Sequence, residues 1–340
     1  MYSWEESLDL QALKNKGTLA IDRAFYELVA APKLQQAFPF HEDRIAVGLV
    51  GEGSECFGFD DEISRDHDFE LGFCMWLTKE DYAEIGQKLS AFYLDLMEHE
   101  GRYFSEMVFG KDVSFSKDRV AGRRGVMEIS RFYAGLLRLN FDLDKLIGQG
   151  YWQYAEPRFL ATVTNGEVFK DDLGIFSEAR QAILAYYPKK TWLLKLAEQL
   201  HLFSHGGQSN YPRMMARKDY VAAHICIDQT ILAAMQIAYL LDKKFPPYYK
   251  WTRRGLTGLS ILPSLSGLLE ELALLPSQSA AWEGYTYSSA GINDSDRVIQ
   301  KIEEIASLLV KELREQGLID HTENFLESHV QTLVRKANLP

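Results

Sequence analysis

The stretch Gly51-Glu-Gly-Ser-Glu-Cys-Phe-Gly-Phe-Asp-Asp-Glu-Ile-Ser-Arg-Asp-His-Asp68 decides the fold, because it joins two apolar runs through a glycine-serine turn and an acidic segment. The run before it is Arg44-Ile-Ala-Val-Gly-Leu-Val-Gly51, and the run after it is Phe69-Glu-Leu-Gly-Phe-Cys-Met-Trp-Leu77. Short apolar runs bounded by turn residues are typical of buried β-strands. The sequence therefore predicts two strands joined by a turn and an acidic segment.

Two carboxylates, Asp66 and Asp68, stand at i and i+2 where the second strand begins, so they share one face about 7 Å apart. Like charges that close are costly unless a cation joins them, and Mg²⁺ is held by a few carboxylates plus substrate phosphates. Gly53 and Ser54 supply N–H groups and a hydroxyl that suit a triphosphate. A solvated acidic loop is the alternative, but such a loop would not need its acids aligned with a strand.

Gly53-Ser54, followed after eleven residues by Asp66-His-Asp68, resembles the signature of the nucleotidyltransferase superfamily, which has the DNA polymerase β-like fold. The whole segment 51–68 is similar to a bacterial family of unknown function, number 4037. The similarity covers roughly residues 40–260 and continues in Thr164-Asn-Gly-Glu-Val-Phe-Lys-Asp171, Gln208-Ser-Asn-Tyr-Pro-Arg-Met-Met-Ala-Arg-Lys-Asp219 and Pro247-Tyr-Tyr-Lys-Trp251.

This resemblance implies an enzyme that transfers a nucleoside monophosphate from an NTP such as ATP to a hydroxyl group and releases pyrophosphate. It implies that Gly53 and Ser54 hold the nucleotide phosphates. It also implies that Asp66 and Asp68 bind Mg²⁺, with Mn²⁺ as the alternative ion. Arg65, beside these acids, either screens their charge or contacts a phosphate.

The superfamily often carries a third carboxylate on a following strand. Glu128, within Gly125-Val-Met-Glu-Ile-Ser130, is the best match for it. It would bind the metal ion or act as base toward the acceptor hydroxyl. Asp112 and Asp118 are rivals whose surroundings are typical of loops, and an exposed strand residue without a catalytic role is the alternative for Glu128.

Helical periodicity takes over from Asp144 onward, so we expect an α+β chain. A nucleotidyltransferase-type mixed sheet with flanking helices is predicted over residues 1–150, and an all-helical domain that completes the cleft over residues 151–340. In the first domain, helices are expected over residues 3–36 and Lys79–His99, the second with Thr78 as its N-cap. In the second, they are expected over Asp144–Gln149, Ser177–Ala185, Lys190–Ser204, Lys218–Asp242, Pro263–Leu275, Ser295–Gln316 and Glu323–Lys336.

Two basic clusters of the helical domain are candidate phosphate contacts. Arg213, Arg217 and Lys218 are predicted on the leading turn of a helix, where the dipole disfavours cations, so an anionic partner is indicated. The partner is either the nucleotide phosphates or the acidic site itself. A solvated turn or a domain-interface salt bridge is the alternative.

The stretch Pro246-Pro-Tyr-Tyr-Lys-Trp-Thr-Arg-Arg254 combines aromatic and cationic side chains, which stack on bases and pair with phosphates. In two-domain nucleotidyltransferases the helical domain supplies such groups across the active-site cleft. The resemblance therefore favours Tyr249, Lys250 and Arg254 as nucleotide-binding residues, with core packing as the alternative.

The composition of the chain limits the classes of substrate and partner that we expect it to bind. The 340 residues include 37 Lys and Arg against 48 Asp and Glu, a net charge of −11, which disfavours long nucleic acids and suits a cationic small-molecule acceptor. A protein side chain is the other acceptor considered. The three cysteines indicate a reducing compartment, and with no signal peptide and no apolar run near the ~20 residues of a membrane span we expect a cytoplasmic protein without membrane contact.

Two other functions compete with this one. A non-catalytic nucleotide-binding regulatory or interaction module would have lost a metal carboxylate, yet Asp66 and Asp68 are intact. An RNA-directed nucleotidyltransferase would need a basic stripe in the helical half, whereas the region after residue 260 is acidic to neutral. The apolar stripe of Ser295–Gln316 is either core or the face of a homodimer.

Overall fold

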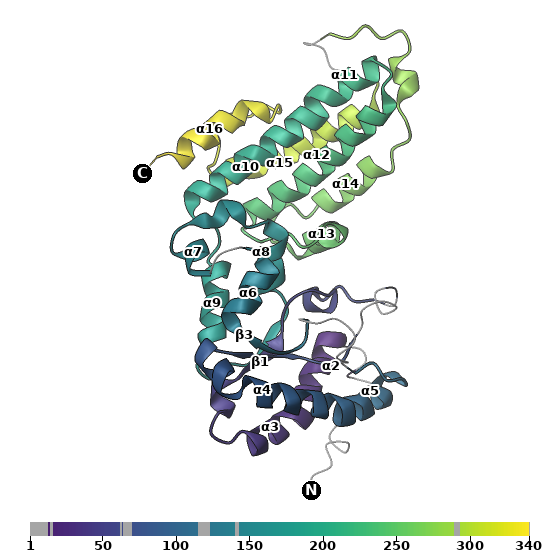
Figure 1. Cartoon of the computed structure of the whole chain (residues 1–340). Coiled ribbons are helices and arrows are strands. Elements are labelled where there is room, and N and C mark those ends of the chain that lie inside the picture. Colours follow the sequence, from purple (N-terminus) through teal and green to yellow (C-terminus); the bar gives the residue numbers. More distant parts are fainter. Residues whose placement is uncertain are drawn as a thin grey trace. The chain divides into compact units, whose positions relative to one another are not determined.

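The computed structural model describes residues 13, 16–61, 63, 70–114, 123–139, 143–288 (the Asp144 side chain excepted) and 293–339. The chain divides into two compact units, Met1–Ala185 and Tyr186–Pro340. The first contains a mixed sheet with flanking helices and the second is helical, which confirms the α+β class (Figure 1). The division falls later than the residue 150 expected from the sequence, because part of residues 151–185 returns to the sheet.

The sheet has the strand order β3-β2-β1-β4. Strand β1 is antiparallel to both of its neighbours, whereas β2 and β3 are parallel. The strands are β1 (Ala46–Leu49), β2 (Cys74–Leu77), β3 (Gly125–Glu128) and β4 (Glu167–Lys170). The sequence predicted the first three and missed β4, whose four half-buried residues form the edge next to β1.

One face of the sheet is covered by helices from the N-terminal part of the chain. Val47, Met75 and Leu77 point into this core. They pack there with residues of α2 (Thr18–Phe25), α4 (Lys79–Leu96) and α5 (Arg102–Phe109). The alternation of side chains along each strand therefore buries one set of residues beneath these helices.

The other face is covered by helices that follow β3. Trp76 stacks on Phe176 with ring centroids 3.9 Å apart and meets Phe132 edge-on at 5.2 Å. Phe176 belongs to α9 (Ile175–Leu184) and Phe132 to α6 (Ile129–Leu137), which packs on α8 (Pro157–Thr164). The sheet is thus the middle layer of the first unit.

Helix α4 begins with a side-chain cap, and helix α2 begins directly after a glycine. Thr78 caps α4, since its hydroxyl accepts the N–H of Asp81 at 3.1 Å, as predicted. Beyond Leu96 the helix continues through a π-helical turn, η6 (Met97–Gly101), into α5. Near the N-terminus, α2 begins directly after Gly17 and continues through η2 (Tyr26–Ala30) and α3 (Ala31–Ala37).

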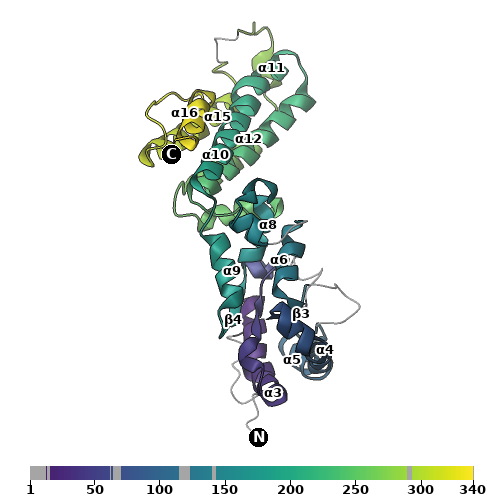
Figure 2. The same ribbon diagram turned by 60° about the vertical axis from the view of Figure 1, so that its left-hand side comes forward.

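The second unit is a bundle in which α12 packs on α10 and α15, α14 on α15, and α16 on α10 (Figures 1 and 2). Asp296 caps α15 by accepting the N–H groups of Val298 and Ile299. The principal helices are α10 (Lys189–Phe203), α12 (Tyr220–Leu241), α14 (Leu265–Ala273), α15 (Arg297–Glu315) and α16 (Glu327–Ala337). They agree with the predicted ranges to within a few residues, and α14 begins after Pro263 rather than on it.

The apolar stripe of α15 is buried within the bundle. Val298, Ile302, Ile305, Leu309 and Leu313 are each at most 3 % exposed, and Leu308 of the same stripe is half-buried. The core interpretation of this stripe is therefore confirmed, and the stripe is not an exposed dimer face.

Helix α12 is the one helix of the described residues that is long and apolar enough to cross a membrane, with a mean hydropathy of 1.4 over its most apolar window. The sequence analysis had found no run of that length, because polar residues interrupt this helix. In the structure 44 % of that window is buried, and α12 packs on α10, α11 (Tyr211–Ala216) and α15. Its apolar residues are those of a bundle helix.

Candidate functional site

The turn Gly51–Ser54 follows β1, where the sequence predicted a phosphate-binding turn. Gly53 has φ +131°, and a Cβ added there would overlap the carboxylate of Glu55, so glycine is required. Within the described part of the chain, the N–H groups of Glu52, Gly53 and Ser54 donate to no acceptor, and the Ser54 hydroxyl has no partner. Toward the described part of the chain, the turn thus presents four hydrogen-bonding groups without a partner.

A buried ion pair supports the turn. Glu55 Oε1 lies 2.7 Å from Nη2 of Arg124, and the two side chains are 10 % and 3 % exposed. Arg124 directly precedes β3, so the pair connects the turn after β1 to the edge strand β3. Each charge is tolerated at this depth only because its partner is present.

A second carboxyl group lies close to this ion pair. Asp22 of α2 is fully buried, and its Oδ1 accepts the N–H of Gly72 at 2.9 Å. Burial raises the pKa of Asp22 well above its ordinary value, against the opposing charge of Arg124. Among the described residues its Oδ2 has no hydrogen-bond partner. Burial therefore favours the neutral form of this carboxyl group.

Helix α2 also forms hydrogen bonds with residues on both sides of the segment that carries the predicted metal ligands. Asp60 Oδ2 accepts the N–H and the hydroxyl of Thr18, at 3.1 and 2.7 Å. One helical turn later, Asp22 holds Gly72 as described above. The described residues before and after residues 64–69 are therefore fastened to the same helix.

Asn165 clamps the turn from the opposite side. Its Oδ1 accepts the Gly51 N–H at 2.9 Å, and its Nδ2 donates to the Gly51 carbonyl at 2.8 Å. The next residue, Gly166, donates its N–H to Cys56 O at 2.7 Å. Gly166 has φ +60°, and a Cβ there would overlap the carbonyl oxygen of Leu49, so only glycine permits this approach.

We call Asn165 and Gly166 the clamp, and Arg180 of α9 forms hydrogen bonds with both of these residues. Its Nη1 donates to Asn165 O at 2.5 Å and its Nη2 to Gly166 O at 3.4 Å. The segment that follows α8 therefore holds the glycine turn and then becomes β4. The sequence analysis quoted both clamp residues within the stretch Thr164–Asp171 and predicted no role for either.

Two further arginines border the turn. Nε of Arg123 lies 3.6 Å from one carboxylate oxygen of Glu52, and Nη2 of Arg138 lies 3.9 Å from the other. Arg138 ends α6, and its guanidinium lies 4.6 Å from the ring centroid of Phe159. The sequence analysis named neither arginine.

Glu128, the predicted third carboxylate, lies at the end of β3 that is away from the turn. In the register of the parallel pair it stands beside Leu77, whereas Gly125, beside Cys74, marks the end of β3 near the turn. The two ends of this strand are about 10 Å apart. Glu128 Oε1 accepts the Ser130 hydroxyl, and Oε2 pairs with Arg131 at 3.0 Å. Its carboxylate is therefore engaged where α6 begins.

Asp112, a rival of Glu128 in the sequence, lies at the opposite end of the sheet. Ser114 forms a parallel bridge with Leu71, just upstream of β2. Asp112 accepts the N–H and the hydroxyl of Ser114 and pairs with Arg102 at 3.1 Å. These contacts lower the pKa of Asp112, although partial burial opposes them. Asp118 lies outside the described residues.

The predicted metal ligands Asp66 and Asp68, together with Arg65, also lie outside the described residues. Among the residues that the structure does describe, no group of three His, Cys, Asp or Glu side chains is arranged to hold a metal ion. The metal site therefore rests on the sequence, and the structure contributes the turn and its supports.

Arg213 and Arg217 occupy a different local structure from the one predicted. They lie in and directly after the last turn of α11, and α12 starts only at Tyr220, capped by Asp219. The helix dipole favours cations at such a C-terminal end, so the expected conflict is absent. Arg213 also donates to the Tyr287 hydroxyl at 3.3 Å.

Tyr249, Lys250 and Arg254 lie on α13 (Tyr249–Gly255) of the second unit. Lys250 and Arg254 approach the ring of Trp251, at 5.4 and 5.5 Å from its centroid. The Tyr249 side chain is 68 % exposed, so core packing does not account for it. This aromatic and cationic surface remains a candidate for ligand binding.

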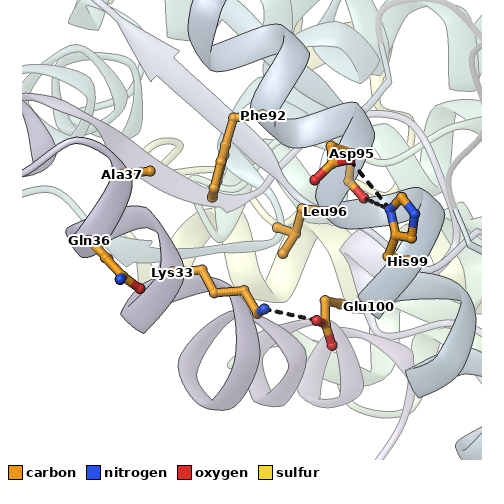
Figure 3. Close-up of a pocket in the computed structure, with 8 residues that line it drawn as sticks. All are labelled: Lys33, Gln36, Ala37, Phe92, Asp95, Leu96, His99 and Glu100. Atoms are coloured by element: carbon orange, nitrogen blue, oxygen red, sulfur yellow. Dashed lines mark hydrogen bonds and ion pairs between the residues drawn. The ribbon is translucent and has the colours of Figure 1, made fainter.

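A pocket of about 580 Å³ occurs elsewhere in the first unit, among α3, α4 and η6 (Figure 3). Lys33 and Glu100 form an ion pair of 2.8 Å in its lining, and His99 contacts Asp95. None of the residues that line it belongs to the turn or its supports.

Residues 152–252 match the family model of a domain of unknown function, DUF4037. The matched region contains Asn165, Gly166 and Arg180, which hold the turn, and Tyr249 and Lys250 of α13. The segment 51–68 lies before it. The DUF4037 match thus covers the clamp of the site rather than the glycine turn itself.

Two curated proteins are similar to parts of this chain. Acetyl-CoA carboxylase 2 of Arabidopsis thaliana is 28 % identical over 130 residues, which is 37 % of this chain and 5 % of that protein. Acetyl-CoA carboxylase 2 of Oryza sativa subsp. japonica is 26 % identical over 134 residues, 37 % of this chain and 6 % of its own length. The chain therefore spans about a twentieth of these relatives, whereas the DUF4037 match concerns the chain's own middle third.

Proposed function

We propose that this protein is a Mg²⁺-dependent nucleotidyltransferase. It would move a nucleoside monophosphate from an NTP to a hydroxyl group of a small-molecule or protein acceptor. The observation that carries the proposal is the turn Gly51–Ser54, whose three N–H groups and serine hydroxyl have no acceptor or partner among the described residues.

The supports of the turn favour a binding role over a connecting one. A connection between β1 and the next element needs no buried ion pair, yet Glu55 and Arg124 are paired beneath it. Nor does it need two hydrogen bonds from Asn165 on its other side. Rigid N–H groups in a glycine turn are a common way of holding phosphate oxygens.

In the proposed reaction the acceptor hydroxyl oxygen forms a bond to the α-phosphorus as the bond to the β-phosphate oxygen breaks. Pyrophosphate leaves, and the hydroxyl proton passes to a base. Gly53 and Ser54 would keep the β- and γ-phosphates in place so that attack occurs in line with the leaving oxygen.

Asp66 and Asp68 would hold the metal ion, since hard carboxylate oxygens are the ligands that Mg²⁺ prefers. An ion held there would neutralise charge on the phosphates. For the base or third carboxylate, the strand register favours Asp112 over Glu128. Asp112 is two residues from Ser114, which bridges Leu71 just upstream of β2, whereas Glu128 lies at the far end of β3.

Within the second unit, α13 is a candidate surface for nucleobase contact. Tyr249 has an exposed ring of the kind on which a nucleobase stacks, and Lys250 and Arg254 are cations beside the neighbouring ring of Trp251. The acidic net charge of −11 favours a small cationic acceptor over a long nucleic acid.

Titration calorimetry of each of the four NTPs, with and without Mg²⁺, tests the proposal. We expect Mg²⁺-dependent binding that is lost in the double variant Asp66→Asn/Asp68→Asn. The matched control is Asp294→Asn/Asp320→Asn, which removes the same two charges from exposed positions of the second unit.

Failure of the folded wild type to bind any NTP would contradict the proposal. Binding without pyrophosphate release, across a screen of hydroxyl acceptors, would instead support a non-catalytic nucleotide-binding module. Release that requires RNA would support the RNA-directed alternative.

A further inference from the structure

Glu52, the second residue of the glycine turn, lies between two guanidinium groups. Arg123 and Arg138 approach different oxygens of its carboxylate, at 3.6 and 3.9 Å. Both distances exceed those of charge-assisted hydrogen bonds, which are about 2.7–2.9 Å. The Glu52 side chain is 43 % exposed and that of Arg138 is 64 % exposed. The carboxylate therefore occupies a space between two cations without forming a close pair with either.

The two cations are placed by ordered parts of the first unit. Arg123 precedes Arg124 of the buried ion pair, and its carbonyl accepts the Cys74 thiol at 3.3 Å. Burial raises the pKa of that thiol to about 12, so Cys74 stays a hydrogen-bond donor at neutral pH. Arg138 follows α6, and its guanidinium lies on the ring of Phe159. Both charges are thus held beside the turn by neighbouring strands and helices.

We propose that Arg123 and Arg138 bind the phosphate chain of the nucleotide, and that the Glu52 carboxylate occupies their site when no nucleotide is bound. This inference rests on the proposed function and names the cations of its phosphate site. A protein with a net charge of −11 repels a polyanion, so local cations are needed beside the turn. Guanidinium groups suit phosphate because they donate two parallel hydrogen bonds.

Glu52 then acts as an internal competitor. The ionised Glu52 carboxylate opposes the charge of the two arginines, and this opposing charge is removed from beside the phosphates when the carboxylate turns to solvent. Glu52→Gln removes the competing charge and keeps the size of the side chain. We expect this variant to bind NTP more tightly, by up to about fivefold, which is the scale of one partly exposed ion pair.

The test measures affinity for MgATP and for inorganic triphosphate by calorimetry. We expect Arg138→Gln and Arg123→Gln each to weaken both affinities by on the order of tenfold, as for loss of a charge-assisted hydrogen bond. The matched control is Arg131→Gln, which removes the same charge from the same helix. Arg131 is 77 % exposed and pairs with Glu128 at the far end of β3, so its loss should leave both affinities unchanged.

The outcomes separate this inference from the proposed function. If MgATP binding is lost in Asp66→Asn/Asp68→Asn but is unchanged in Arg138→Gln and in Glu52→Gln, the inference is overturned and the proposed function stands. If the wild type binds triphosphate through Arg138 but no NTP, the phosphate site stands and the proposed function fails. If the wild type binds neither compound, both are overturned. Arg138 is exposed, so its variant should fold even if Arg123→Gln does not.

Discussion

Asn165 and Gly51 exchange two hydrogen bonds, of 2.9 and 2.8 Å, although 114 residues separate them in the sequence. The side-chain amide satisfies both the N–H and the carbonyl of the first residue of the turn. An Asn side chain does this because it carries one donor and one acceptor in a plane. This contact ties the DUF4037 region to the glycine turn that precedes it.

Replacement of Asn165 by Ala should destabilise the protein and weaken nucleotide binding together. Loss of the amide leaves two backbone groups of Gly51 without their partner, at a cost of about 1–3 kcal/mol. Urea denaturation and NTP titration measure the two effects. Asn338→Ala serves as control, because Asn338 makes one exposed hydrogen bond near the C-terminus. Unchanged affinity in Asn165→Ala would contradict a role for the clamp in binding.

The buried ion pair beneath the turn should contribute far more to the free energy of unfolding than an exposed pair with the same separation. Arg124→Met should lower the free energy of unfolding by about 3–5 kcal/mol, because it leaves Glu55 buried without a counter-charge. The pair Arg253–Glu270 has the same separation of 2.7 Å but is about half exposed. Arg253→Met should therefore cost about 1 kcal/mol or less.

A double variant completes this comparison. Arg124→Met/Glu55→Gln removes both charges, so it should be more stable than Arg124→Met alone. Equal losses in Arg124→Met and Arg253→Met by denaturation would show that burial does not set the strength of the inner pair.

Gly53 and Gly58 allow a test of the turn in which only the surroundings differ. Both have positive φ, but a Cβ at Gly53 meets the Glu55 carboxylate, whereas a Cβ at Gly58 meets nothing within 4 Å. Gly53→Ala should abolish NTP binding, while Gly58→Ala should cost about 1 kcal/mol of stability and leave binding intact. Calorimetry and circular dichroism distinguish these results. Equal binding by both variants would remove Gly53 from the site.

Asp22 should make the protein less stable as the pH rises. Burial raises its pKa in the folded state, so the unfolded chain loses this proton first, near pH 3.9. Between the unfolded and folded pKa values the folded state binds more protons, so the free energy of unfolding falls with rising pH and then levels off.

Asp22→Asn keeps the acceptor for Gly72 and lacks this titration. The stability of the variant minus that of the wild type should therefore increase with pH from about pH 4 until the folded pKa is passed. Urea denaturation across this range measures it. A difference that is constant with pH would show that Asp22 titrates normally in the folded protein.

The two candidate third carboxylates can be separated by activity. Asp112→Asn should reduce pyrophosphate release at saturating MgNTP, by about 10²-fold or more if Asp112 is the base. Glu128→Gln should leave turnover unchanged, because Glu128 lies beside Leu77 and is held by Ser130 and Arg131. The opposite result would return the role to Glu128.

Local patterns predicted the fold well where they are strong. The apolar runs of β1, β2 and β3 and the Thr78 cap are features of single segments, and the structure has them where the sequence predicted them. Strand β4 was missed because only two of its four residues are apolar and the strand lies between turn-forming residues. Its partner β1 supplies the reason for its conformation, and that pairing is not visible in one sequence.

The same distinction applies to the site. The glycine turn is a local motif and was predicted, whereas its supports come from distant segments. Nothing near Arg124 or Asp22 in the sequence indicates that they meet around Glu55. Glu128 was favoured for its place on a strand, but register decides which end of the sheet a residue occupies, and register depends on the partner strand.

The late arrival of β4 has a consequence for how the protein is made. A chain leaves the ribosome from its N-terminus, so the glycine turn emerges long before Asn165 has been synthesised. Until then β1 lacks its outer neighbour and has an open edge, the kind of surface on which nascent chains associate wrongly. The first unit therefore cannot finish folding during the early part of translation, and a pause or truncation before residue 170 leaves it exposed to aggregation.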